Sequence, residues 1–100
     1  MIKHIVFWRL DETMAGSSRE EDVDLLRIEV EALRDLIPFV LQIELGENEN
    51  DTETAWDLAL YSEFDSWEDL EAYQVHPAHE RVREMVNRFQ VDRAVVDYEV

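Results

Sequence analysis

Hydrophobic and polar positions alternate through residues 2–10, which read IKHIVFWRL. This period of two, carried by β-branched and aromatic side chains, predicts a β-strand. One face of the strand would carry Ile2, His4, Val6, Trp8 and Leu10. The other face includes Ile5 and Phe7, so the predicted strand is apolar on both of its sides.

A helical pattern follows the polar connection over residues 11–17. Apolar residues then recur at spacings of three and four, the stripe of an amphipathic helix, at Val23, Leu26, Val30, Leu33 and Ile37. We expect Ser17 or Ser18 to cap this helix, because a glutamate stands three residues after each serine. Pro38 is expected to end it.

Two further strands are predicted, FVLQIELG over residues 39–46 and AWDLALYSEF over residues 55–64. The polar segment between them carries no pattern of a helix or strand and predicts a loop. In the second of these strands, alternation assigns Trp56, Leu58, Leu60 and Phe64 to one face. The opposite face would carry Ala55, Asp57, Ala59 and Tyr61.

A second helical region is predicted from Asp65 or Ser66, with Ser66 and Asp69 as a capping pair. Its inner side would carry Trp67, Leu70 and Tyr73. Pro77 lacks an amide proton and must interrupt the helix, so we expect a new helical segment from Pro77 to about Phe89. The last ten residues, VDRAVVDYEV, predict a final strand.

The order β-α-β-β-α-β predicts an α+β fold of the ferredoxin-like sandwich type, with a four-stranded antiparallel sheet. Right-handed crossovers would place the first and third strands in the centre and both helices on one face. The face without helices, called the open face below, would still carry Ile5, Phe7 and Tyr61. Since an apolar face of this size must be covered, we expect a homodimer that pairs two open faces into an α/β barrel.

Composition and charge limit the type of protein this chain can be and the partners it can bind. The chain has 100 residues, of which 46% are hydrophobic, and this predicts a single domain over residues 1–100 with a substantial core. A net charge of −16 would repel nucleic acid and anionic membrane surfaces, so neither is an expected partner. There is no cysteine, and the N-terminus reads as a strand rather than a signal peptide, so we expect a cytoplasmic location.

The candidate chemistry lies in residues 73–82, YQVHPAHERV. His79, Val82 and Val86 share one stripe of the predicted helix, which turns His79 toward the sheet. Tyr73 and His4 are its expected neighbours, whereas His76 precedes the proline and is expected at the helix entrance, either capping it or exposed. This arrangement of Tyr73, His79, His4 and His76 is open to four interpretations.

In the first interpretation His79 only satisfies buried backbone groups while Tyr73 packs its ring inward. The second is a small-molecule pocket between helices and sheet, where His4, Trp8, His76 and Trp56 would contact a ligand. The third is acid–base catalysis, in which His79 takes a proton next to a carbonyl and Tyr73 donates to the enolate oxygen. A metal site is the fourth and the poorest, because two histidines at i, i+3 are an incomplete ligand set; neither a metal nor a cofactor is predicted.

Polar residues on the last strand form another small set. Asp92, Arg93 and Asp97 could be a catalytic group, but a salt-bridged edge at the dimer seam is the preferred interpretation. Arg93 and Asp97 share one face of the strand, with Val95 between them.

Three segments together resemble the family of stress-responsive dimeric α/β-barrel (Dabb) proteins. They are MIKHIVFWRL, LALYSEFDSWEDLEAYQVHPAHERV and DRAVVDYEV. The resemblance implies a ferredoxin-like fold and a homodimeric barrel, and it implies little about activity. One branch, olivetolic acid cyclase, folds a linear polyketide without a cofactor, and its catalytic tyrosine and histidine lie in a motif similar to that of Tyr73 and His79 here. The functions that remain open are a ligand-binding protein, such a cyclase- or lyase-like enzyme, and a purely structural stress protein.

Overall fold

The computed structural model describes residues 1–11 and 16–100, with the backbone alone for residues 16–18. The elements follow the order β1 (Ile2–Leu10), α1 (Gly16–Leu36), β2 (Gln42–Glu47), β3 (Leu58–Phe64), α2 (Trp67–Gln74), α3 (Pro77–Asn87) and β4 (Gln90–Glu99). The predicted βαββαβ order is therefore confirmed, with the second helical region divided in two at Pro77. None of the helices in the described ranges is long and apolar enough to cross a bilayer.

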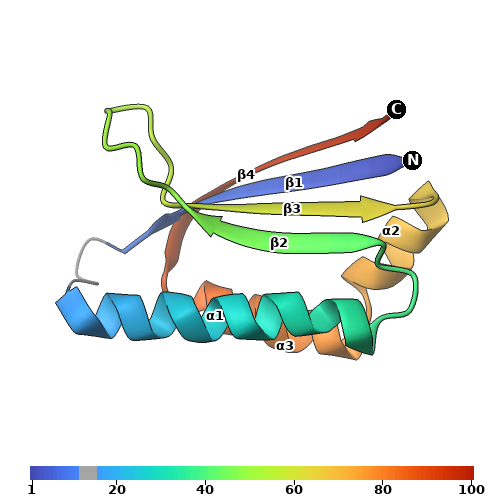
Figure 1. Cartoon of the computed structure of the whole chain (residues 1–100), viewed down its shortest axis with the longest axis horizontal. Helices are drawn as coiled ribbons and strands as arrows, with labels where there is room; N and C mark the ends of the chain where they lie inside the picture. Colours follow the sequence, from blue (N-terminus) through green and yellow to red (C-terminus); the bar gives the residue numbers. More distant parts are fainter. Residues whose placement is uncertain (12–15) are drawn as a thin grey trace.

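All four strands form one antiparallel sheet in the order β2-β3-β1-β4, so the first and third strands are central as expected. The register places Val6 between Leu60 on β3 and Val95 on β4. Figure 1 shows the sheet edge-on, with α1 and α3 side by side against one of its faces. This face and the two helices enclose the core, so the protein has the predicted ferredoxin-like fold.

Helix α1 forms because its apolar stripe has a buried place under the sheet. All five residues of the predicted stripe are at most 1% exposed, and the helix ends at Leu36, two residues before Pro38. At the other end the helix already includes Gly16, which lies before the predicted caps Ser17 and Ser18. The side chains of these two serines lie outside the described residues, so their capping role stays a prediction.

Side chains cap the N-termini of both α2 and α3. Ser66 Oγ accepts a hydrogen bond from Asp69 N at 3.1 Å, which confirms the predicted cap of α2. Pro77 opens α3, and His76 Nδ1 accepts from Ala78 N at 3.1 Å as its N-cap. The predicted inner position of Trp67 is wrong: it is 45% exposed, since it is the first residue of α2 and lies beyond the end of β3.

The face of the sheet opposite the helices is only partly covered by the chain itself. Its side chains alternate with the buried ones along β1 and β3 and are half-buried, while Val96 and Tyr98 on β4 are 51% and 39% exposed. Within the described chain this face carries Ile5, Phe7, Ala59, Tyr61, Val96 and Tyr98. The open face predicted from the sequence is therefore present in the chain.

Trp56 does not lie where alternation put it. Strand β3 begins only at Leu58, and Figure 1 shows the loop before it on the side of the sheet away from the helices. Trp56 packs against Phe7 with ring centroids 6.4 Å apart, and the Arg9 guanidinium lies 4.5 Å from its ring. The prediction that Trp56 shares a face with Leu58 is wrong, because residues outside a strand do not follow its period of two.

Candidate functional site

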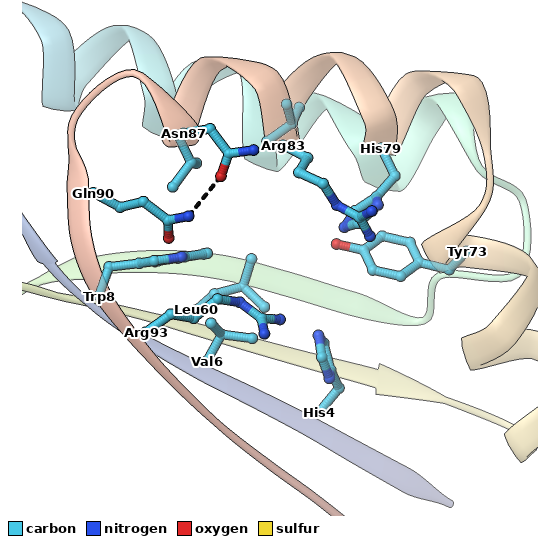
Figure 2. Close-up of a pocket in the computed structure, with 12 residues that line it drawn as sticks. His4, Val6, Trp8, Leu60, Tyr73, His79, Arg83, Asn87, Gln90 and Arg93 are labelled. Atoms are coloured by element: carbon cyan, nitrogen blue, oxygen red, sulfur yellow. Dashed lines mark hydrogen bonds between the residues drawn. The ribbon is translucent and has the colours of Figure 1, made fainter.

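A cavity of about 360 Å³ lies between the central strands and α3, and we call it the helix–sheet cavity. Its apolar wall consists of Val6, Trp8, Leu60, Val82 and Val86. Figure 2 shows the polar side chains that complete the lining, which are His4, Tyr73, His79, Arg83, Asn87, Gln90 and Arg93. An apolar chamber with a few convergent polar groups is the usual form of a small-molecule site.

Tyr73 closes one end of the helix–sheet cavity. Its side chain is only 1% exposed, and its ring packs 4.9 Å from Phe64 and 4.4 Å from His79, measured between centroids. The hydroxyl forms no hydrogen bond with any described residue, yet it is not sealed from solvent. Burial raises the pKa of Tyr73, so the phenol keeps its proton and is a hydrogen-bond donor to whatever occupies the cavity.

His79 is oriented by the break between the two helices. Its Nδ1 lies 3.0 Å from the carbonyl oxygen of Gln74, a group near the C-terminal end of α2. A carbonyl can only accept, so Nδ1 donates and the lone pair of the neutral ring is on Nε2. Nε2 has no partner among the described residues and is not sealed from solvent. Burial is the main cause that lowers the pKa of His79, which favours the neutral ring.

His4 is a second imidazole on the same cavity. It is 3% exposed on β1, and its Nδ1 donates to the Asp97 carboxylate at 2.5 Å, since the β1–β4 register sets these two residues opposite each other. Its ring meets Tyr73 edge-on at 6.2 Å. Within the chain, Asp97 pairs with His4 and Arg93 lines the cavity, so these two residues do not pair with each other. The salt-bridged edge at the dimer seam stays a prediction.

Four of the six predicted site residues meet at this cavity, namely His79, Tyr73, His4 and Trp8. His76 and Trp56 do not line it: His76 caps α3 as foreseen, and Trp56 lies on the open face beside a separate hollow of about 450 Å³. Within the described residues, no group of three or more histidines and carboxylates gathers as a metal site would require. The arrangement can donate from one phenol, accept at imidazole nitrogens and hold an apolar body.

Sequence reasoning missed Arg83, Asn87 and Gln90, and it preferred a salt-bridged edge to a cavity position for Arg93. Arg83 and Asn87 follow His79 at i+4 and i+8, so extending the helical stripe through polar positions would have found them. The position of Arg93 at the cavity depends on the β1–β4 register, which sets it opposite Trp8.

The buried position of His79 predicts a pH dependence of stability. Because its pKa is below the ordinary 6.5, the unfolded chain binds this proton more tightly than the folded chain. The contribution is constant above pH 6.5 and decreases as the pH falls below it. Denaturant unfolding of the wild type and His79→Gln, from about pH 8 to about pH 5, should show the wild type losing more free energy of unfolding. Parallel curves would contradict this expectation.

Comparison with known proteins agrees with this fold. The Stress responsive A/B Barrel Domain (Dabb) family model matches residues 2–100. A dimeric protein of unknown function and ferredoxin-like fold from Bacteroides fragilis is 34% identical with a TM-score of 0.91, over 99% of this chain and 95% of that one. A dimeric ferredoxin-like protein of unknown function from Thermobifida fusca is 22% identical with a TM-score of 0.84, over 99% and 90%.

A hydroxynitrile lyase from Passiflora edulis also shares the fold, at 17% identity and a TM-score of 0.83 over 99% of this chain and 92% of that one. No curated protein matches the sequence significantly. The family match spans nearly the whole chain, and the ferredoxin-like sandwich described above has the same architecture as these dimeric neighbours. The chain belongs to the Dabb family of stress-responsive A/B barrel domain proteins.

Proposed function

We propose that the protein binds a small apolar or phenolic molecule in the helix–sheet cavity. The observation that carries this proposal is that Tyr73 Oη and His79 Nε2 open onto one apolar chamber without a partner among the described residues, while Gln90 Oε1 of the same lining is buried and unpaired. Polar groups that line an apolar pocket without a protein partner are the groups that orient a bound ligand. A ligand with a carbonyl or hydroxyl at this end would supply the partner, and its apolar body would lie against Trp8 and Leu60.

A purely structural role accounts for part of the site. The bond from His79 to Gln74 and the inward packing of the Tyr73 ring are what a structural cluster requires. A structural role does not account for the Tyr73 hydroxyl and the His79 Nε2, which have no partner among the described residues and lie beside a cavity of about 360 Å³. A core that served stability alone would fill such a space with side chains.

A second candidate function is cofactor-free proton transfer next to a carbonyl, of the cyclase or lyase type. The specific support is the tautomer of His79: with Nδ1 donating to Gln74, the Nε2 lone pair is available as a base. A proton would move from the α-carbon to Nε2, and the C–H electron pair would form the enolate. The Tyr73 hydroxyl would donate to the enolate oxygen, and its raised pKa keeps that proton in place.

We also propose that the protein is a homodimer that buries its open face against the same face of a second copy. The dimeric neighbours with this fold support the assembly, and so do the half-buried apolar side chains on that face. The helix–sheet cavity lies on the opposite side of the sheet, so each protomer would keep its own cavity.

Binding is tested by calorimetry with a panel of substituted phenols and small apolar acids. We expect at least one ligand to bind the wild type and raise its melting temperature. Tyr73→Phe and His79→Gln should each weaken that ligand about tenfold or more, because each removes one hydrogen bond in a desolvated site. His76→Asn is the matched control, since His76 lies three residues from His79 and does not line the cavity, and asparagine can keep the N-cap of α3. A panel without any binder would overturn the proposal.

Catalysis is tested separately, with a methyl ketone that binds the cavity and with β-polyketones. Incorporation of deuterium from D₂O next to the carbonyl reports proton transfer to Nε2 without requiring the natural substrate. His79→Gln should reduce any enzyme-dependent rate by about 10²–10⁴, the usual contribution of a general base. A rate unchanged in His79→Gln would remove this residue from the mechanism and leave the binding function.

A further inference from the structure

The charge of the cavity lining is opposite to that of the chain. A quarter of all residues are aspartate or glutamate, and the net charge is −16. The twelve lining residues nevertheless include two arginines and no acidic residue. Of the carboxylates beside the lining, Asp97 is engaged by His4 and Glu80 by Arg83. The surface as a whole repels anions, so a cationic cavity would select an anion against that background.

Arg93 is the principal cation of this cavity. It stands opposite Trp8 in the β1–β4 register, and Figure 2 shows its side chain lying over the sheet between Trp8 and His4. Its guanidinium forms no ion pair or hydrogen bond with a described residue; only its backbone N–H is bonded, to Asp92. Five N–H donors are therefore directed at the cavity and at solvent without a protein acceptor.

Arg83 is a second cation, but its charge is partly compensated. One of its nitrogens lies 3.4 Å from the Gln74 carbonyl that also holds His79, and another lies 3.3 Å from Glu80. Burial raises the pKa of Tyr73 and lowers the pKa of His79; the Arg83 charge opposes the first shift and adds to the second, which places it at their end of the cavity. An anion near Tyr73 would therefore meet Arg83 as well as Arg93.

We propose that the ligand of this cavity is a carboxylate with an apolar body, held through its anionic group by Arg93 with help from Arg83. The inference rests on the proposed binding function and names the chemical class of its ligand. A carboxylate accepts two parallel N–H bonds from a guanidinium, and such charge-assisted bonds are about twice as strong as neutral ones. A neutral phenol would use the Tyr73 and His79 end but would leave Arg93 without a partner.

The test compares ligands of equal shape and different charge. Calorimetry measures the affinity of two carboxylates, 3-phenylpropionate and 5-phenylpentanoate, and of their primary amides. Phenol is the neutral reference. The carboxylates should bind about tenfold or more tightly than their amides, as expected for one charge-assisted pair. Arg93→Gln should remove most of this preference, while the affinity for the amide stays the same. Arg93→Lys should recover only part of it, because lysine keeps the charge but lacks the fork.

Arg81→Gln is the charge-matched control, since Arg81 is an exposed arginine on α3 that does not line the cavity. It should leave the preference for the carboxylate unchanged. Amides or phenol that bind as tightly as the carboxylates would overturn the inference and leave the binding function in place. No binding by any probe would overturn both. If Arg93→Gln changed the mass of the assembly in solution and left the ligand preference unchanged, the inference would also be overturned. The guanidinium would then serve subunit association rather than ligand binding.

Discussion

Val96→Asp should convert the protein from a dimer to a folded monomer at micromolar concentration. Val96 lies on the open face of β4, paired with Ile5 of β1, and is 51% exposed in the single chain. In the proposed dimer this face is covered by its symmetry mate, so an isologous interface would carry the new charge twice. An uncompensated buried charge costs on the order of 3–5 kcal/mol. The dimer would bury two such charges, and this cost is large enough to abolish association.

Light scattering coupled to size exclusion gives the mass, and circular dichroism checks the fold. Folding should persist because the substituted position is half exposed in the isolated chain, where only the loss of strand propensity, about 1 kcal/mol, is expected. Val75→Asp is the matched control: Val75 is 75% exposed after α2, away from the open face, and this variant should stay dimeric. A wild type of monomer mass, or a dimeric Val96→Asp, would remove the open face from the assembly.

Tyr73→Ala should lower the free energy of unfolding by about 3–5 kcal/mol, whereas Tyr73→Phe should leave it nearly unchanged. The ring is almost completely buried against Phe64 and His79, so alanine removes its contacts and leaves a void. The hydroxyl has no partner among the described residues, so its removal sacrifices no bond within the protein. The two variants thus separate the packing role of the ring from the chemical role of the hydroxyl.

Urea unfolding of both variants gives the free energies, and the ligand titrations described above give the functional effect. Trp67→Ala on the same helix is the control for aromatic loss, since Trp67 is 45% exposed and its removal should cost much less. If Tyr73→Phe were as destabilising as Tyr73→Ala, the hydroxyl would serve the fold. The cavity would then lose its main argument for a ligand.

Local rules predicted the elements but not all of their edges. The stripe of α1, the Ser66 cap and the break at Pro77 were readable because each depends on neighbours within four residues. Trp56 and Trp67 were misplaced because both lie at or before the start of an element, where the periodic pattern does not yet hold. The predicted strands over residues 39–46 and 55–64 were also too long at their starts, since β2 begins at Gln42 and β3 at Leu58.

The order of elements, the apolar residues on both faces of β1 and the inward direction of His79 follow from the amino-acid pattern alone, because period and helix capping are local properties. The pairing of His4 with Asp97, the place of Arg93 beside Trp8 and the position of Trp56 away from the cavity come from the three-dimensional fold. These facts follow from strand register and from the path of a loop. Both are set by contacts between residues far apart in the chain, which no local pattern encodes.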